Sequence, residues 1–166
     1  IKSLLLVCVY IFSQLTMASP LIVHDAKQDL AHYIEYIEDQ TQQLTIQEVL
    51  HQPKQWQMQK QDKPYFGYSK SAYWLKVDVQ TTAYQQSAPR LLEVAYPLLD
   101  DIQIFLVQNQ KVIQQWQLGD KWLFEQREIP HHLFIVPINL AAQQHYQFYF
   151  RIQSSSGLQV PISLWP

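Results

Sequence analysis

In two strand-like segments, aromatic and charged side chains occupy the same set of alternate positions, the set that also carries the polar residues. In the first segment Trp74 shares its phase with Asp78, and in the second Tyr149 shares its phase with Arg151. A flat ring beside a charged group is how proteins hold a sugar, because the ring stacks on one side while charge-assisted hydrogen bonds reach the hydroxyls. The pattern therefore predicts carbohydrate recognition. The competing interpretation is that the segment 40–65 covers this face of a sheet, so that the rings form a second layer of core.

The metal-ligating residue types lack the spacing of a metal site. His131 and His132 are adjacent, so on a strand their side chains would point to opposite faces and could not chelate one ion. Asp100, Asp101 and Asp120 carry the hard oxygen ligands that calcium uses, but aspartate is equally typical of turns at strand ends. We predict no metal, and calcium is kept as the alternative.

The composition argues against several classes of enzyme. The 3 glycines lie far apart, which rules out a P-loop and a dinucleotide-binding fingerprint. Cys8, the single cysteine, lies in the N-terminal leader, so the mature chain has no thiol nucleophile and no disulfide. There is no G-x-S-x-G elbow, and no spacing of carboxylates singles out an acid and a base for glycoside hydrolysis. We predict a non-enzymatic protein without catalytic residues and without a cofactor.

The chain carries little charge. Charged residues make up 16% of the 166 residues, the formal net charge is −2, and glutamine supplies much of the polar surface, with 26 residues. The 12 lysines and arginines are scattered singly, so the sequence has no basic stripe of the kind found in nucleic-acid-binding proteins. We expect no nucleic-acid partner.

The first 18 residues predict a secretory signal peptide. Lys2 precedes an apolar run from Leu4 to Phe12, and a segment of small residues then ends at Ala18. The apolar run is shorter than the ~20 residues that a membrane-spanning helix needs. Cleavage after Ala18 would leave a single domain, residues 19–166, and an exported chain without cysteines fits the bacterial periplasm.

Apolar and polar residues alternate along most of the mature chain, which is the pattern of half-buried antiparallel strands. The expected strands are 31–38, 73–79, 90–96, 102–107, 111–118, 132–140, 145–153 and 158–165. A tight hairpin turn is expected at Asn109-Gln110. This many short strands, separated by frequent turns, predicts an all-β fold, either a sandwich or a barrel.

One segment near the N-terminus is expected to be helical. Thr45 and Glu48 match a capping box, which would open a short helix through about His51. The region 25–38 suits either a helix or a strand, and its aromatic and β-branched residues favour the strand. The glutamine-rich stretch 52–62 is expected to form a loop across the sandwich.

Six short motifs resemble one protein family and occur in the family's order. They are Gly67-Tyr68-Ser69 with Tyr73-Trp74-Leu75-Lys76-Val77; Tyr96-Pro97-Leu98-Leu99-Asp100; Gly119-Asp120; Phe124 and Arg127 with Ile129-Pro130-His131; Tyr149-Phe150-Arg151-Ile152 with Ser154-Ser155; and Pro161-Ile162-Ser163-Leu164-Trp165. They are similar to the type 2 extracellular domain of the seven-transmembrane receptors with diverse intracellular signalling modules. The resemblance spans about residues 28–165, and its specificity comes from the order of the motifs.

The resemblance implies a jelly-roll-like antiparallel β-sandwich, similar to carbohydrate-binding modules, that acts as the periplasmic sensor of a bacterial receptor. The cytoplasmic output of such receptors is usually a histidine kinase or a diguanylate cyclase. A receptor would continue beyond Pro166 into seven membrane helices, so we expect either a piece of an inner-membrane receptor or a free periplasmic protein. The family positions carried over as candidate binding or structural residues are Trp74, Asp100, Asp120, Arg127, His131 and Arg151.

Two functions are compatible with these features. The first is a sensor domain that binds a carbohydrate or a related small polar ligand. The second is an interaction module in which the aromatic face meets another protein or a second copy of the chain, since aromatic residues and arginine are enriched in interface hot spots. For Arg127 the structural alternative is an ion pair with Asp120 that positions a loop. The ligand-binding residues predicted for the first function are Trp74, Tyr96 and Trp122 for stacking, and Asp100, Asp120, Arg127, His131 and Arg151 for polar recognition.

Overall fold

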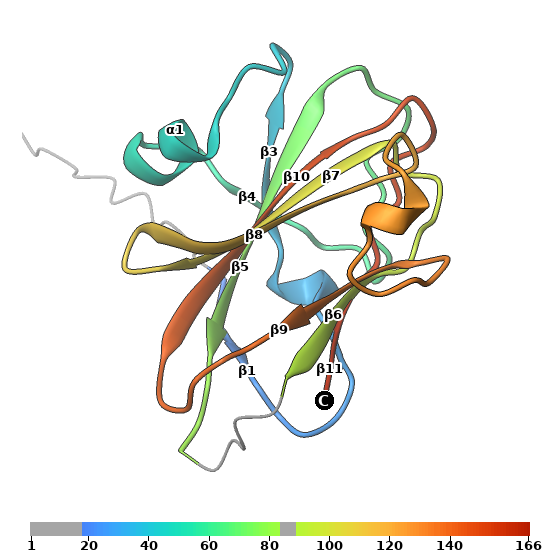
Figure 1. Ribbon diagram of the computed structural model, residues 1–166. Coiled ribbons are helices and arrows are strands. Elements are labelled where there is room, and N and C mark those ends of the chain that lie inside the picture. The colour runs from blue at the N-terminus through green and yellow to red at the C-terminus, as the bar shows by residue number, and fades with distance from the viewer. Residues whose placement is uncertain (1–17, 84–88) are drawn as a thin grey trace, which may run out of the picture.

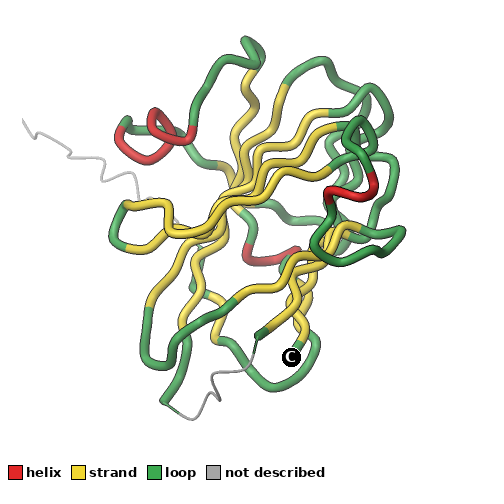
Figure 2. The backbone as a smooth tube through the Cα atoms, in the orientation of Figure 1, coloured by secondary structure: helices red, strands yellow, loops and turns green. Residues whose placement is uncertain are grey.

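The computed structural model describes residues 18–83 and 89–166 (Figure 1). The predicted signal peptide and Cys8 lie outside these residues, except for Ala18 at the end of the leader. Strands dominate the described chain, and the helical segments are short (Figure 2). They are the helix α1 (Ile46–His51) and two 3-10 helices, η1 (Ala31–Tyr33) and η2 (Phe124–Gln126).

The strands form two sheets that face each other. The larger sheet has the order β4-β3-β5-β10-β7-β8, with β1 pairing in parallel with β5, and the smaller sheet has the order β2-β11-β6-β9. The larger sheet contains β1 (Leu21–Ile22), β3 (Glu35–Asp39), β4 (Gln57–Met58), β5 (Ala72–Gln80), β7 (Asp101–Gln108), β8 (Lys111–Leu118) and β10 (His145–Gln153). The smaller sheet contains β2 (Gln28–Asp29), β6 (Arg90–Val94), β9 (Phe134–Ile138) and β11 (Ile162–Trp165).

The chain crosses repeatedly between the two sheets. It passes from β5 to β6 and back to β7, and later from β8 to β9, to β10 and to β11, changing sheet at each of these steps. Apart from the β1–β5 pair, the strand pairs described are antiparallel. The predicted all-β, jelly-roll-like sandwich with one short helix is confirmed.

The main core fills the space between the sheets with the inward phase of each strand. Burial of this phase removes large apolar side chains from water and supplies the dominant stabilising term. The inward phase predicted for the central strands is confirmed, but these strands are not half-buried, because much of their outward phase is buried as well. The fully buried inward residues include Leu75, Val77 and Val79 of β5, Ile102, Ile104 and Leu106 of β7, and Phe148, Phe150 and Ile152 of β10.

A second layer of core covers the outer face of the larger sheet. Here a cluster of buried residues, which we call the outer cluster, packs against partly buried side chains of the segment 44–56, and Trp74 stacks on Phe105 with ring centroids 5.9 Å apart. This is the arrangement anticipated by the alternative reading of the aromatic phase. The outer cluster consists of Ile37, Val49, Trp74, Phe105, Val107 and Tyr149.

The capping box fixes where the covering helix begins. The hydroxyl of Thr45 accepts a hydrogen bond from the backbone N–H of Glu48 at 3.3 Å, and the carboxylate of Glu48 accepts one from the backbone N–H of Thr45 at 2.8 Å. Both orphan donors at the start of α1 are thereby satisfied. The predicted hairpin turn is also confirmed, since Asn109 and Gln110 both have positive φ, 50° and 59°, as a primed turn requires.

Some predicted strand boundaries are wrong. Residues 31–33 form a 3-10 helix, and the strand expected from residue 31 begins at Glu35. The strand expected over 158–165 begins only at Ile162, because Leu158 and Val160 donate their backbone N–H groups to the carbonyls of Gly67 and Pro64 instead. The expected loop 52–62 contains the two-residue strand β4.

The histidine pair also departs from the prediction. Strand β9 begins at Phe134, so His131 and His132 lie in the preceding loop and not on a strand. Their rings do not point to opposite faces: the centroids are 4.2 Å apart. His131 is committed to the backbone, because its Nδ1 accepts a hydrogen bond from the N–H of Leu133 at 3.1 Å.

Candidate ligand-binding site

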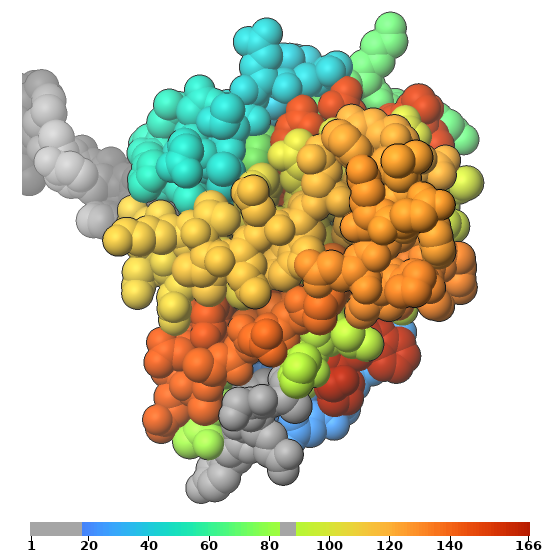
Figure 3. Space-filling view, in the orientation of Figure 1, coloured from blue at the N-terminus to red at the C-terminus, as the bar shows by residue number. Residues whose placement is uncertain are grey.

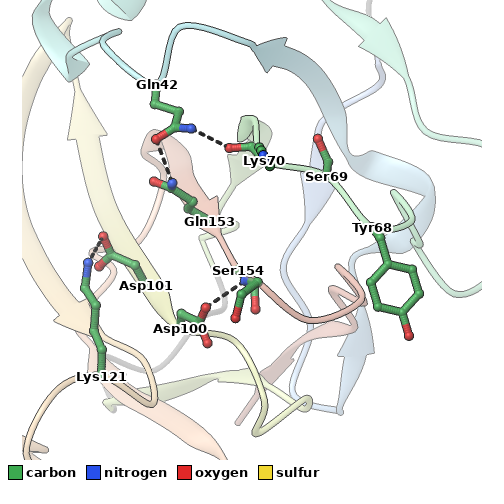
Figure 4. Close-up of a pocket in the computed structure, with 10 residues that line it drawn as sticks. Gln42, Tyr68, Ser69, Lys70, Asp100, Asp101, Lys121, Gln153 and Ser154 are labelled. Atoms are coloured by element: carbon green, nitrogen blue, oxygen red, sulfur yellow. Dashed lines mark hydrogen bonds and ion pairs between the residues drawn. The ribbon is translucent and has the colours of Figure 1, made fainter.

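Loops from five connections surround a polar hollow at one end of the sandwich (Figure 4). Its volume is about 650 Å³. The loops follow β3, β6, β8 and β10 and precede β5, and antiparallel strands bring these ends together. The lining residues are Gln42, Tyr68, Ser69, Lys70, Asp100, Asp101, Lys121, Gln153, Ser154 and Ser155.

Asp101 is the buried anchor of the hollow. The residue is only 6% exposed, and Lys121 Nζ donates to its Oδ2 at 2.7 Å while Trp122 Nε1 donates to its Oδ1 at 3.1 Å. Arg151 Nη1 lies 3.9 Å from the same Oδ2. A buried carboxylate is tolerated when cations and hydrogen-bond donors compensate for the lost hydration. These contacts tie the loop after β8 to the first residue of β7.

A chain of hydrogen bonds extends this network along the wall of the hollow. Arg151 Nη2 donates to the backbone oxygen of Gln42 at 3.0 Å, and Gln153 Nε2 donates to the side-chain oxygen of Gln42 at 2.8 Å. Gln42 in turn donates from its side-chain amide to the backbone oxygen of Lys70 at 2.7 Å. The wall is therefore preorganised, because each side chain is held by the next.

The opposite side of the hollow is built around Asp100 and a run of serines. Asp100 Oδ2 accepts a hydrogen bond from the backbone N–H of Ser155 at 2.6 Å. The hydroxyls of Ser154 and Ser156 both donate to the backbone oxygen of Leu98, at 3.1 and 2.7 Å. The β6–β7 and β10–β11 loops are thus joined directly. Asp100 Oδ1 faces no hydrogen-bond donor among the described residues.

Gly119 allows the loop after β8 to lie directly on the start of β7. Its φ is 131°, and a Cβ at this position would come within 2.1 Å of the backbone oxygen of Asp100. The close approach lets the N–H groups of Asp120 and Lys121 donate to the carbonyls of Leu99 and Asp100, at 2.8 and 3.3 Å. Only glycine has both the conformation and the space that this contact requires.

Three of the predicted site residues meet at the hollow. Asp100 lines it, and Trp122 and Arg151 contact the lining residue Asp101 from either side. Asp120 is exposed and lies next in sequence to the lining residue Lys121.

Two predicted stacking residues lie elsewhere. The side chain of Trp74 is 0% exposed in the outer cluster, and its buried Nε1 has no hydrogen-bond partner among the residues described. Tyr96 is partly buried and packs against the main core between the sheets. Neither ring presents an open face to the hollow, so neither is included among the ligand contacts proposed below.

Arg127 and His131 form a separate structural unit in the loop before β9. The guanidinium lies between two rings, 4.9 Å from the centroid of Phe124 and 4.7 Å from that of Phe134. Its Nη1 also donates to the backbone oxygen of His131 at 2.7 Å. The expected ion pair with Asp120 is wrong: within residues 18–83 and 89–166, Arg127 makes no salt bridge to it. Arg127 positions a loop, but through cation–π contacts and a backbone hydrogen bond.

Several lining residues carry no distinguishing signal in the sequence. Gln42 and Gln153 are indistinguishable from the other glutamines of a chain with 26, and Lys121 is one of many single cations. Tyr68 did carry a signal, since it follows Gly67 in the first family-like motif, and its side chain is 81% exposed at the rim of the hollow.

The aspartates do not assemble a cation site in the described part of the chain. Among those residues, no group of three or more histidine, cysteine, aspartate or glutamate side chains is placed to hold a metal. The oxygens of Asp101 accept from a lysine and an indole, and one oxygen of Asp100 accepts from a backbone N–H.

A two-sheet β-sandwich with a polar hollow built by its loops is the class of module defined by this fold and this site. The chain belongs to the 7TMR-DISM extracellular 2 family, whose model matches residues 31–166. It is therefore a sensor-like extracellular domain of a seven-transmembrane receptor, located outside the cytoplasm. No curated protein matches the chain. None of the helices in residues 18–83 and 89–166 has the length and apolar character needed to cross a membrane.

Proposed function

We propose that this domain is the ligand-binding, non-enzymatic sensor of its receptor, and that it holds a carbohydrate or a related small polar molecule in the hollow lined by Asp100 and Tyr68. The observation that carries the proposal is a preorganised polar wall beside an exposed ring. The hollow, at about 650 Å³, also lies within the 300–1,000 Å³ range of small-molecule sites.

The chemistry of the lining suits a neutral, hydroxyl-rich ligand. Asp100 offers a carboxylate oxygen as an acceptor, while Lys70 and the hydroxyl of Ser155 offer donors, so a ligand that both donates and accepts is matched. Charges of both signs line the hollow, which favours a polyhydroxylated molecule over a strong anion or cation. Tyr68 supplies the flat face on which a sugar ring would stack.

The position of the hollow suggests how binding would be reported. The β6–β7 and β10–β11 loops each connect one sheet to the other, and both contribute lining residues. A ligand that contacts both loops would favour one arrangement of these connections over another, and such differential binding is the condition for a signal.

The test is a calorimetric titration of the purified chain with neutral and charged mono- and disaccharides, together with Tyr68→Ala and Asp100→Asn. We expect a sugar to bind and each variant to weaken the association roughly three- to tenfold, the range of one stacking contact or one hydrogen bond. The matched control is Tyr65→Ala, another exposed tyrosine, which lines a different hollow and should leave the affinity unchanged. Failure of every sugar in the panel, or equal affinity for wild type and both site variants, would refute the proposal.

A further inference from the structure

Strand β8 leaves a long edge of the larger sheet unprotected. In the described part of the chain it is the last strand of that sheet, pairs only with β7, and has eight residues. Residues 112–118 contain no charged residue, no proline and no glycine. Figure 3 shows β8 as a gold band across the near face of the molecule, with no other segment over it. Its pairing with β7 has a bulge at Ile113, and beyond this bulge residues 114–118 pair regularly with β7. A long edge strand that is largely uncharged is a template for pairing with another strand.

The other sheet edges have the protection that β8 lacks. Strands β4 and β2, which end the larger and the smaller sheet, have only two residues each. Strand β9, at the remaining edge of the smaller sheet, carries Pro137, which cannot donate to a neighbouring strand. Short edge strands and proline are devices that prevent edge-to-edge association. In β8 such protection is confined to its first end, where Lys111 begins the strand and Ile113 forms a bulge. Residues 114–118 have no comparable device, so this part of the edge is the one most open to pairing with another strand.

Three exposed apolar side chains lie on β8 and in the segment that follows it. Ile113 is 48% exposed, Leu123 is 66% exposed and Phe124 is 46% exposed. These three are among the few large hydrophobic residues left exposed in the described chain. A partner strand along β8 would therefore bury apolar surface in addition to forming backbone hydrogen bonds.

We propose that β8 pairs antiparallel with β8 of a second copy, so that the larger sheets of two domains form one continuous sheet. An antiparallel pair of identical strands is related by a two-fold axis, and both copies then use the same surface. Alternate residues of an edge strand direct their N–H and C=O groups outward, and these groups would be satisfied across the axis.

The charges at the ends of β8 favour a second copy as the occupant. Lys111 begins the strand and Asp120 follows its end, and neither makes an ion pair within residues 18–83 and 89–166. Within one copy the two residues are about 30 Å apart along an extended strand, too far to interact. Antiparallel pairing of the two β8 strands places the Lys111 end of one copy beside the end of the other copy that leads into Gly119 and Asp120, and symmetry repeats this arrangement. A parallel arrangement would instead bring the two lysines together.

The first test measures self-association of the purified chain by sedimentation equilibrium from micromolar to millimolar concentration. We expect a reversible dimer, and we expect Gln115→Lys to weaken it at least tenfold on an order-of-magnitude basis, because two lysines would face each other at the axis. The control is Gln47→Lys, the same substitution at an exposed position on α1, which should leave the dimer unchanged. Thermal unfolding checks that both variants fold.

The second test is charge reversal. Lys111→Glu and Asp120→Lys should each weaken the dimer roughly 3- to 30-fold, since each places like charges together at both ends of the interface. The double variant K111E/D120K should restore the wild-type constant. A monomer at all concentrations, a dimer insensitive to Gln115→Lys, or a double variant no tighter than the single variants would each overturn the proposal. These outcomes do not depend on ligand binding, so they are separate from the test of the sensor function.

Discussion

Substitution of Gly119 by alanine is the sharpest single test of how the hollow is built. The backbone at this residue has φ 131°, and a Cβ would lie 2.1 Å from the oxygen of Asp100 and 2.6 Å from its carbonyl carbon. Both of these atoms belong to the backbone, so no side-chain rotation relieves the overlap. The loop after β8 must therefore move away from the start of β7.

The cost can be worked out from the contacts that this movement breaks. A non-glycine residue in this conformation costs about 1–3 kcal/mol. Separation of the two segments also loses the hydrogen bonds that Leu99 and Asp100 accept from the loop, at about 1 kcal/mol each. We expect Gly119→Ala to lower the free energy of unfolding by roughly 3–5 kcal/mol, a large share of the ~5–15 kcal/mol typical of a domain.

Gly67 provides the matched control. Its φ is also positive, at 76°, but a Cβ there would meet nothing within 4 Å. Gly67→Ala should therefore cost only the left-handed conformational strain, about 1–2 kcal/mol. Urea unfolding monitored by tryptophan fluorescence gives both values. Equal losses for the two variants, within about 0.5 kcal/mol, would show that the close approach to Asp100 does not constrain the loop and would refute the reasoning.

Three further predictions concern the outer layer. Hydrogen bonds from the backbone N–H and then from the hydroxyl of Thr45 lower the pKa of Glu48 below 4.5. The ionised Glu48 therefore stabilises the folded protein above pH 4.5, and this contribution is lost as the pH falls through the folded-state pKa. Glu48→Gln should abolish that part of the acid dependence measured by urea unfolding between pH 3 and pH 7. Burial first, and neighbouring carboxylates second, raise the pKa of Tyr149 above 10.0. The free energy of unfolding should therefore fall as the pH rises through 10, because the unfolded chain loses this proton more readily than the folded one. Tyr149→Phe should reduce this loss between about pH 9 and pH 11. Trp74→Ala should lower the free energy of unfolding by about 3–5 kcal/mol, measured by urea unfolding.

The sequence was most informative where the two faces of a strand differ in burial. The boundaries expected for β8 and β10 coincide with the observed ones, because a one-residue shift in register would turn the whole apolar phase toward the opposite face. The helix α1 was located by its capping box, a local interaction that needs no tertiary contact. Both kinds of signal depend on residues close together in sequence.

The errors arose where contacts other than the alternation of a strand determine the path of the backbone. The first half of the expected strand 158–165 bonds to residues 64–67, almost a hundred positions earlier, and no local pattern reports such pairing. His131 and His132 lie in a loop shaped by Arg127, whose guanidinium is held between two phenylalanine rings. The alternation of residues could not predict that interaction.

The candidate site was only partly predictable for a similar reason. Asp100 and Arg151 stand out by residue type at strand ends, and the fold brings those ends together. Gln42 enters the hollow only because its own backbone is left-handed, with φ 60°, in a residue type that carries no special preference for that conformation. Its role follows from the loop geometry and not from its chemistry alone.

The outer layer and the hollow are connected by the turn that follows β3. The turn after β3 is held from below by Asp39, which is 3% exposed and accepts hydrogen bonds from the N–H groups of Thr41 and Leu44, at 3.2 and 2.9 Å. This turn presents Gln42 to the wall of the hollow and leads directly into the segment that covers Trp74. The ring that the sequence suggested as a ligand contact therefore supports the segment that carries a lining residue. Any ligand that moves Gln42 would act on this covering segment, which makes α1 the element whose displacement should accompany binding.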